Sequence, residues 1–419
     1  MSLSINRLAA SALIFVAGCF GPPPEVADVK CSTVVELEPT RTDILFVIDN
    51  SCSMTRKQEE LAASLEQFVN TLKNAEIRQD FQVGIVTTGI WQLTAEDKGV
   101  PLLWPEESGR LQTRARQDGT QTPKVLRSDS PSFLDDFKAA VRVGNQGSGH
   151  ETHLEAAWRA VGNVPVGGGE TRALIDIPQE EGGNKGFLRD GARLLIITVT
   201  DEDDCSERRD RPTVEIGPDY RIDYCDKQQD KLTPVSEYAA LFRGLRDSLL
   251  RPREVSFAAI APVGRANREV YRVDDFIIDP DGNQQPGFHN IDCPTSLGVG
   301  RRIVDFARLF ADVRVNVDSI CNSDYQNTLI AFARFVEATN EYELKVPPPD
   351  PNLMLIDLVR GDGSVQHCAY RETAPSDPSH GWFEYEPATA ETKARVKLRG
   401  RCARRPDDKR LEFKLVCAS

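Results

Sequence analysis

The sequence predicts an α/β domain with a doubly wound, mainly parallel sheet, followed by a small all-β domain. Short apolar runs alternate with helical periods from about residue 40 to residue 340. Helical periodicity then ends at a proline-rich stretch, 347–351, and only short β-type runs follow it. Because alternation of strand and helix is typical of parallel sheets with helices on both faces, the first region indicates that architecture.

The N-terminal residues 1–18 have the features of a signal peptide. One positive charge, Arg7, precedes an apolar run at 8–17 that is shorter than the roughly 20 residues of a membrane span. The run ends in Val16-Ala17-Gly18-Cys19, which resembles a bacterial lipobox, in which Cys19 is lipidated and becomes the mature N-terminus. An ordinary secretory signal with a chance cysteine is the alternative.

Residues 19–39 are interpreted as a lipidated tether. Consecutive prolines at 22–24 stiffen such a segment and hold the body away from the bilayer. Residue 20 is Phe rather than Asp, so the resemblance to Gram-negative lipoproteins implies an outer-membrane anchor, on the periplasmic or the cell-surface face. We expect lipid to be the only contact with the membrane.

Charge and cysteine content narrow the class of protein. The formal net charge is −13, which argues against nucleic-acid binding because that function needs a basic face. Ten cysteines are typical of an exported, oxidising environment, in agreement with the signal segment.

We assign residues 40–345 to the α/β domain on the order of its predicted elements. The predicted strands are short, buried apolar runs at 43–48, 81–87, 193–199 and 254–261. The predicted helices carry apolar residues at helical spacing and lie at 55–75, 133–141, 152–161, 235–250, 300–312 and 325–339. Two polar stretches with little periodicity, 92–131 and 203–233, are interpreted as long insertions.

Residues 346–419 are assigned to the second domain. Its β-type runs are separated by Gly, Pro or charged turns and lie at 353–359, 365–370, 382–385, 394–398 and 411–417. Their spacing predicts about five to seven strands in an Ig-like sandwich.

Oxygen-bearing side chains follow two of the predicted strands. Asp49, Ser51 and Ser53 come after the strand at 43–48, and Asp201 comes after the strand at 193–199. Thr152 lies at the end of a glycine-rich loop. Since the carboxyl ends of parallel strands share one sheet edge, these hard oxygen ligands predict a site for Mg²⁺, or alternatively Mn²⁺ or Ca²⁺. Helix capping is the alternative interpretation of Asp49-x-Ser51-x-Ser53 taken alone.

These residues resemble a von Willebrand factor A (vWA) domain with a metal-ion-dependent adhesion site. Matched to that motif, the metal ligands are Asp49, Ser51, Ser53, Thr152 and Asp201. Ser148 is a weaker competitor for Thr152. The resemblance covers about residues 40–345, and the two insertions would border the site. Thr55-Arg56-Lys57 does not supply the acidic residues of the adjacent regulatory ion site found in some such domains.

The resemblance implies a protein that binds an Asp or Glu of a partner protein through its metal ion, and not an enzyme. A non-catalytic assembly factor of an envelope complex is the main alternative, and an enzyme of unfamiliar type is a third. His-Glu-x-x-His, Gly-x-x-x-x-Gly-Lys-Ser/Thr and Gly-x-Ser-x-Gly are all absent from the sequence.

Disulfide connectivity stays open at the level of sequence. Cys52–Cys205 across the metal site and Cys205–Cys225 within the second insertion are the competing pairs. Cys293–Cys321 and Cys402–Cys417 are plausible local bonds. With Cys19 lipidated, an odd number of cysteines remains, and Cys31 is our candidate for the unpaired one.

Three further motifs receive structural interpretations. We attribute His150 and His153 to loop polarity, because their spacing approaches that of a zinc site but no third ligand is implied. Residues 279–283 have the composition of a hairpin turn rather than of a calcium loop. The acidic run 201–204 is interpreted as a solvated rim, apart from Asp201.

Overall fold

The chain divides into two units in the computed structural model, and each is described by itself. The structure describes residues 31–37, 41–77, 79–92, 102–103, 107–116, 118–162, 184–207, 214, 223–279, 281–334, 340–344, 347–375, 377, 380–389 and 393–415. Of these described residues, the larger unit comprises those between 37 and 340 with 404–408, and the smaller one comprises those at 31–36, between 341 and 403, and at 409–415. The signal segment, Cys19, Cys417 and the side chain of Cys31 lie outside the described residues.

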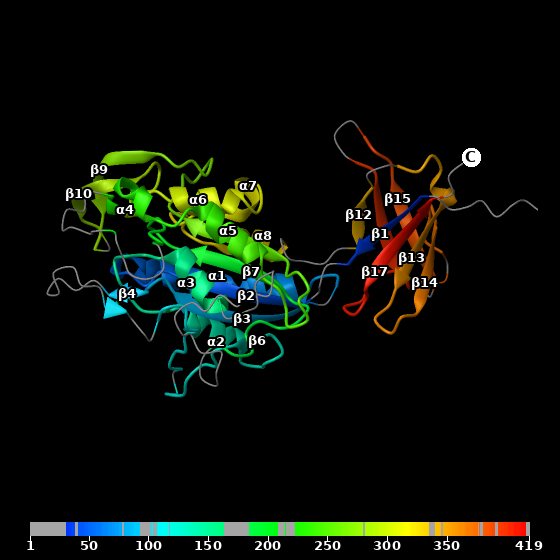
Figure 1. The fold of residues 1–419 in the computed structure, drawn as a ribbon, viewed down its shortest axis with the longest axis horizontal. Coiled ribbons are helices and arrows are strands. Elements are labelled where there is room, and N and C mark those ends of the chain that lie inside the picture. The colour runs from blue at the N-terminus through cyan, green and yellow to red at the C-terminus, as the bar shows by residue number, and fades with distance from the viewer. Residues whose placement is uncertain are drawn as a thin grey trace, which may run out of the picture. The chain divides into compact units, whose positions relative to one another are not determined.

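The larger unit is mixed α/β, as predicted, and is organised around a six-stranded sheet (Figure 1). The strand order is β11-β8-β7-β2-β3-β6. The strands are β2 (Arg41–Ile48), β3 (Asp80–Thr87), β6 (Leu126–Arg127), β7 (Arg193–Val199), β8 (Val255–Ala261) and β11 (Val317–Ser319). All neighbours pair in parallel except β3 and β6. Ile48 pairs with both Thr87 and Val199, so β2, β3 and β7 end level with one another.

Helices cover each face of this sheet. One apolar core joins the sheet to α1 (Thr55–Lys73), α2 (Phe133–Ala140) and α8 (Gln326–Arg334). A second core joins it to α3 (His153–Val161), α5 (Val235–Arg243) and α6 (Arg301–Arg308). The central strands are buried from both sides because alternate residues enter different cores, for example Leu45 in one and Phe46 in the other.

The larger unit also contains several short helices and strands. They are β4 (Trp91–Gln92) with β5 (Leu102–Leu103), α4 (Tyr224–Lys227), α7 (Val313–Asn316) and the 3-10 helices Cys52–Met54 and Gln229–Lys231. The hairpin prediction at 279–283 is confirmed, because β9 (Arg272–Ile278) pairs antiparallel with β10 (Gln284–Asn290). Asp279 accepts the backbone amides of Asp281 and Asn283, which shapes the turn between them.

The smaller unit contains seven strands that are linked in one hydrogen-bonded series, β1-β17-β13-β14-β15-β16-β12. They are β1 (Cys31–Glu36), β12 (Glu341–Glu343), β13 (Met354–Val359), β14 (Val365–Tyr370), β15 (Gly381–Glu386), β16 (Arg395–Gly400) and β17 (Arg410–Leu415), with a 3-10 helix at Pro351–Leu353. The tether prediction is wrong for Cys31–Glu36, which pairs antiparallel with β17 along all six residues. The β-branched run Thr33-Val34-Val35 favours a strand, and β17 supplies the partner edge.

The disulfides correct part of the predicted connectivity. Two of the predicted pairs, Cys205–Cys225 and Cys293–Cys321, are present as disulfides. Cys52 is a free, exposed thiol, so the Cys52–Cys205 pair is wrong. Cys402 bonds Cys368 rather than Cys417, because the turn after β16 brings it against β14, with 5.9 Å between the two Cα atoms.

Within the part of the chain that the structure describes, no helix combines the length and the apolar character that crossing a membrane requires.

Candidate metal centre

Three adjacent parallel strands deliver polar side chains to one edge of the larger unit's sheet. Thr87 and Thr88 stand at the end of β3, Asp49 follows β2, and Asp201 lies two residues beyond β7. The backbone amide of Asp49 donates to the carbonyl of Val199 at 3.0 Å, which extends the β2–β7 pairing up to the site. The topology therefore brings together groups that are about 150 residues apart in the chain.

Asp49 is fully buried and is held by uncharged donors. Its Oδ1 accepts the backbone amide of Ser51 at 2.8 Å, and its Oδ2 accepts the hydroxyl of Thr200 at 2.7 Å. Gln58 of α1 donates to the Asp49 carbonyl at 3.0 Å. Among the described residues, the hydrogen bonds that reach this carboxylate come from an amide and a hydroxyl rather than from a cation.

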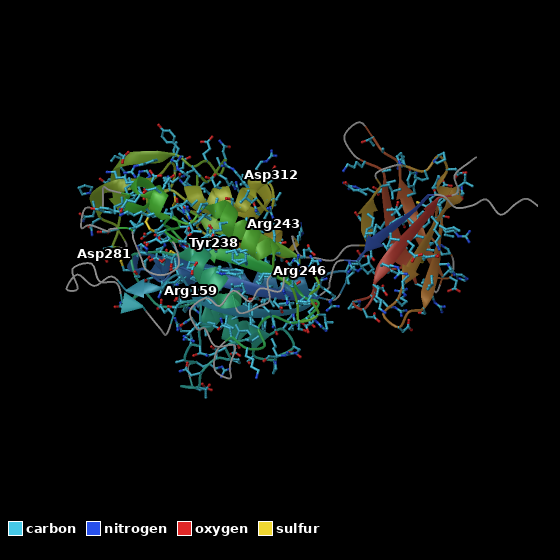
Figure 2. The ribbon with its side chains drawn as sticks, viewed as in Figure 1. Arg159, Tyr238, Arg243, Arg246, Asp281 and Asp312 are labelled. Atoms are coloured by element: carbon cyan, nitrogen blue, oxygen red, sulfur yellow. A yellow bond between two sulfur atoms is a disulfide. The ribbon has the colours of Figure 1, made fainter. Side chains whose placement is uncertain are left out.

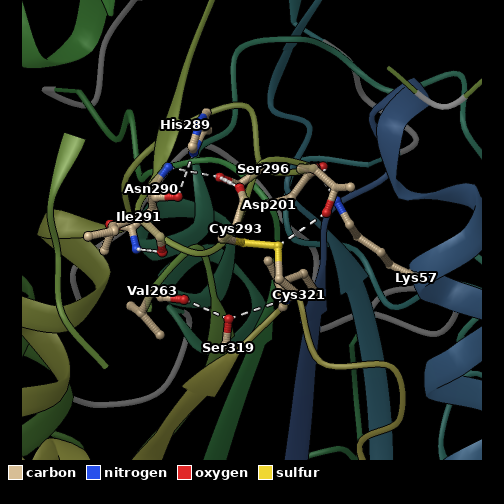
Figure 3. The surroundings of a disulfide bond; sticks show 12 residues. Lys57, Asp201, Val263, His289, Asn290, Ile291, Cys293, Ser296, Ser319 and Cys321 are labelled. Atoms are coloured by element: carbon tan, nitrogen blue, oxygen red, sulfur yellow. Dashed lines mark hydrogen bonds and ion pairs between the residues drawn. A yellow bond between two sulfur atoms is a disulfide. The ribbon is translucent and has the colours of Figure 1, made fainter. Parts of the chain in front are cut away.

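A chain of hydrogen bonds leads from the two serines to the second carboxylate. The hydroxyls of Ser51 and Ser53 are 3.0 Å apart, and Ser53 donates to Oδ1 of Asp201 at 3.0 Å. Lys57, buried on α1, donates to Oδ2 of Asp201 and to the carbonyl of Thr295 at 2.8 Å. Figure 3 shows Lys57 and Asp201 beside the disulfide that anchors the Thr295 loop.

The glycine-rich loop closes over the end of β2. The amide of Gly147 donates to the carbonyl of Asn50 at 2.7 Å. A Cβ at residue 147 would lie only 2.6 Å from that carbonyl oxygen, so the close approach requires glycine. Asn50 in turn donates to Glu107 at 2.9 Å, which brings part of the segment 92–131 beside the end of β2.

The same loop places Thr152 and Glu151. The Thr152 hydroxyl donates to the carbonyl of Thr88 at 2.7 Å, and the Thr88 hydroxyl donates to Oε2 of Glu151. One ligand atom each from Asp49, Glu151 and His153 lie within 4.8 Å of one another, and all three residues are buried. The loop thus places the Glu151 carboxylate near that of Asp49.

The prediction of a solvated rim at 202–204 is wrong for Asp203 and Asp204, which bind the starts of two helices. Asp203 accepts the backbone amides of Arg302 and Ile303, at the start of α6. The buried Asp204 accepts the amide of Leu154 at 3.0 Å, at the start of α3, and forms an ion pair with Arg302 at 3.0 Å. Each aspartate satisfies amides that the first turn of a helix leaves unpaired.

Buried polar contacts also fix α3, which carries His153. Glu155 accepts a hydrogen bond from Arg159 of the same helix at 2.9 Å and one from Tyr238 of α5 at 2.6 Å. Arg159 and Tyr238 are labelled in Figure 2. Helix α3 therefore holds its first turn, with His153 at its first position, in a defined place beside the sheet edge.

The two histidines are fully buried, so loop polarity does not explain them. Nε2 of His150 lies 2.7 Å from a carboxylate oxygen of Glu207. His153 makes no hydrogen bond through either ring nitrogen, and its Nδ1 is 3.9 Å from Oδ1 of Asp204. Burial lowers the pKa of His153 to about 4, so its ring is neutral at pH 7.

The carboxylates repel one another. Burial, and after it the charge of Asp201, raises the pKa of Asp49 to about 6. Burial followed by the charges of Asp49 and Glu202 raises the pKa of Glu151 well above its usual range. Burial and the charges of Asp49 and Asp201 do the same for the pKa of the half-buried Glu202.

Asp43, at the other end of β2, shows how this fold treats a buried carboxylate with a structural role. Arg189 donates to Asp43 through its Nε and its backbone amide, both at 2.7 Å, and Arg253 lies 3.8 Å away. Asp49 has no such guanidinium partner among the described residues. The oxygen-rich, negatively charged donor set around Asp49, with the buried and unpartnered Oε1 of Glu151, therefore fits a divalent cation.

The structure places the predicted ligands in two groups. Asp49, Ser51, Ser53 and Asp201 are linked through hydrogen bonds at one edge, whereas the Thr152 hydroxyl is engaged with Thr88. Ser148, the competitor of Thr152, accepts the amide of His150 at 3.0 Å. Lys57, Glu151 and His153 also lie at this edge but were not among the predicted ligands. Lys57 follows Ser53 by one helical turn, and this spacing could have indicated that Lys57 lies near the site.

The chain is similar to known proteins at the level of structure. No protein-family model and no curated protein match its sequence. Among solved structures, the chain is similar to a von Willebrand factor type A protein from Catenulispora acidiphila, with 12% identity and a TM-score of 0.30 over 91% of this chain and 64% of that one.

Two bacterial pilus proteins are also similar to the chain. The pilus adhesin SpaC from Lactobacillus rhamnosus GG, in its open conformation, has 10% identity and a TM-score of 0.33, over 90% of this chain and 39% of that one. The structure of three N-terminal domains of the type V pili tip protein Mfa5 from Porphyromonas gingivalis has 12% identity and a TM-score of 0.28, over 92% of this chain and 62% of that one. The chain spans less than two thirds of each of these three structures.

Replacing Lys57 by Met tests the ion pair with Asp201. Removing one partner of a buried pair leaves an uncompensated charge, so we expect the free energy of unfolding of the metal-free protein to fall by about 3–5 kcal/mol. Urea titration measures it. The control is Arg56→Met, since Arg56 is the preceding residue of α1 and its side chain is 86% exposed. A loss for Lys57→Met no larger than that of Arg56→Met would contradict the account.

The raised pKa of Asp49 predicts how stability depends on pH in the metal-free protein. The folded state holds the Asp49 proton up to about pH 6, whereas the unfolded chain releases it near pH 3.9. Asp49 therefore stabilises the folded state fully below about pH 4, and this stabilisation is lost as the pH rises through about 6. Relative to Asp49→Asn, the wild type should lose roughly 2–3 kcal/mol between pH 4 and pH 7.5 in urea titrations. A pH-independent difference between the two proteins would refute this assignment.

Proposed function

We propose that the protein is a cell-envelope lipoprotein whose larger unit is a vWA-type domain that binds a protein ligand through a divalent metal ion. An Asp or Glu of the ligand would complete the coordination of that ion. The observation that carries the proposal is the buried Asp49, which is surrounded by oxygen donors and further carboxylates and lacks a cationic partner among the described residues.

Asp49, Ser51, Ser53, Thr152 and Asp201 are the residues proposed to hold the ion, with Mg²⁺ as the expected ion and Mn²⁺ or Ca²⁺ as alternatives. Asp49 and Asp201 supply charge, and the hydroxyls supply neutral oxygens. Neutral ligands leave the bound ion with net positive charge, which attracts a carboxylate from outside. The ion itself supplies a coordination position that a ligand's carboxylate can take from water.

The exposure of the surrounding residues supports access from solvent. Ser53 is half-buried and its neighbour Cys52 is exposed, whereas Asp49 and Asp201 below them are buried. In the glycine-rich loop, Asn145, Gln146 and Gly149 are exposed, and Asn145 donates to the hydroxyl of Thr55 at 3.2 Å. Both segments beside the serine hydroxyls therefore have residues in contact with solvent.

The chemistry of this site is sufficient for reversible binding. The proposed steps are the displacement of water and the formation of one oxygen–metal contact, and neither breaks a covalent bond. We therefore propose a role in adhesion or recognition rather than catalysis.

Peptides offer a direct test of ligand chemistry. The purified chain, with Mg²⁺, should bind immobilised peptides that contain Glu or Asp in preference to matched peptides that contain Gln or Asn, and EDTA should release it. Asp49→Ala and Ser53→Ala should weaken this binding by at least about tenfold, because each removes part of the site.

The matched control is Cys52→Ser, which changes an exposed side chain of the same loop and should bind like the wild type. Equal binding to the acidic and the amide peptides would overturn the proposed ligand chemistry. Stable association with one envelope subunit that resists EDTA would favour a role in assembly instead.

The envelope location is proposed from the N-terminal sequence alone. Arg7, the apolar run 8–17 and Cys19 follow the pattern of a lipoprotein precursor. Lipid on Cys19 would anchor the protein in the outer membrane, on its periplasmic or cell-surface face, and leave both folded units outside the bilayer.

Lipidation at Cys19 can be measured by metabolic labelling with an alkyne fatty acid in a Gram-negative host. The wild type should incorporate the label and Cys19→Ser should lose it completely, because the thiol is the acceptor. Cys31→Ser is the control and should stay labelled. An unlabelled wild type, or a labelled Cys19→Ser protein, would show that the N-terminus is processed in another way.

A further inference from the structure

Asp49, Glu151 and His153 form a buried cluster at the edge of the sheet. Asp49 belongs to the β2 end, Glu151 to the glycine-rich loop and His153 to the first turn of α3. One potential ligand atom from each lies within 4.8 Å of the other two. The exposed fractions of these residues are 0%, 1% and 0%, so water reaches none of them freely.

Unpartnered polar atoms point to a missing ligand at this cluster. Oε1 of Glu151 and both ring nitrogens of His153 are buried without a hydrogen-bond partner. Buried polar atoms in native proteins are nearly always hydrogen-bonded or bound to a metal, because otherwise their desolvation is uncompensated. A cation bound beside Asp49 would partner Oε1 of Glu151 and one ring nitrogen of His153.

His150, the other buried histidine of this segment, has a carboxylate of its own close to its ring. Its Nε2 lies 2.7 Å from a carboxylate oxygen of Glu207. The nearest carboxylate to His153 belongs to Asp204, at 3.9 Å, and Asp204 already accepts bonds from Leu154, Ser206 and Arg302. His150 is thus paired with a carboxylate outside the cluster, whereas the ligand atoms of Asp49 and Glu151 lie within 4.8 Å of that of His153.

Negative charge gathers around the cluster. The ammonium of Lys57 lies against Asp201. The carboxylates of Asp49, Glu202 and Asp201 act on Glu151, whose hydrogen bond comes from the neutral hydroxyl of Thr88. A cation bound beside Glu151 would offset this negative charge.

We propose that Asp49, Glu151 and His153 form a second cation subsite, which shares Asp49 with the serine site and takes a transition-metal ion of the Zn²⁺ type. Imidazole nitrogen is a preferred ligand of zinc and its neighbours, whereas Mg²⁺ and Ca²⁺ prefer oxygen. Zinc is bound in proteins by His nitrogen and by Asp or Glu oxygen, the donor types present here. This subsite goes beyond the proposed function, since an ion there is not needed for ligand binding at the serines.

Calorimetric titration of the metal-stripped full chain with Zn²⁺ and, separately, Mg²⁺ tests the subsite. All proteins carry Cys52→Ser, because the exposed thiol could bind zinc. In that background, His153→Gln should weaken Zn²⁺ binding by at least about tenfold and leave Mg²⁺ binding unchanged. Ser53→Ala should do the reverse, since Ser53 belongs to the serine site alone. His150→Gln, which changes a buried histidine of the same loop outside the cluster, should bind both ions like its parent.

Three results would overturn the proposal. The first is unchanged Zn²⁺ affinity in His153→Gln. The second is a loss of Zn²⁺ affinity in His150→Gln as large as that in His153→Gln. The third is an equally large loss of Zn²⁺ affinity in Ser53→Ala, which would mean a single shared site. If the second subsite fails in one of these ways but Ser53→Ala still loses Mg²⁺ binding, the proposed serine site stands. Circular dichroism monitors folding, and Glu151→Gln replaces His153→Gln if the latter fails to fold. The visible spectrum of the Co²⁺-loaded parent should report a nitrogen ligand that is lost in the His153 variant.

Discussion

The structure depends most on one buried charge, the carboxylate of Asp49 at the end of a central parallel strand. Strand β2 carries two buried aspartates, and the fold treats them differently. Asp43 receives a guanidinium from Arg189, whereas the hydrogen bonds described for Asp49 come from a backbone amide and a hydroxyl. A carboxylate kept in this state costs stability unless an external cation binds it. That cost is the physical argument for a metal centre.

The loops around Asp49 are built to keep this arrangement rigid. Gly147 allows the glycine-rich loop to lie directly on the β2 end. Asp203 and Asp204 bind the first turns of α6 and α3, so the segment that follows Asp201 connects two helices to the site. Lys57 joins α1 to Asp201 and to the loop anchored by Cys293–Cys321. The segments that carry Asp49 and Asp201 are therefore held by contacts with the glycine-rich loop and with α1, α3 and α6.

Sequence patterns predicted those helices and strands whose formation depends on residues close together in the chain. The run at 193–199 matches β7 to the residue, and the helix predicted at 55–75 corresponds to α1, because continuous apolar runs and helical spacing are local signals. Pairings across long sequence distances could not be predicted in this way. Strand β1 depends on the edge of β17, and the Cys368–Cys402 bond depends on how β14 and β16 are brought together. For the same reason the sequence indicated Asp49 and Asp201 but not Lys57 or Glu151, whose roles arise only from the assembled sheet edge.

The most direct measurement is a crystal structure of the chain grown with Mn²⁺, with anomalous diffraction recorded at the manganese edge. The account predicts an anomalous peak within bonding distance of a carboxylate oxygen of Asp49, at the common edge of β2, β3 and β7. A well-ordered sheet edge that carries no peak at saturating Mn²⁺, with the Asp49 carboxylate still held only by Ser51 and Thr200, would contradict the central claim.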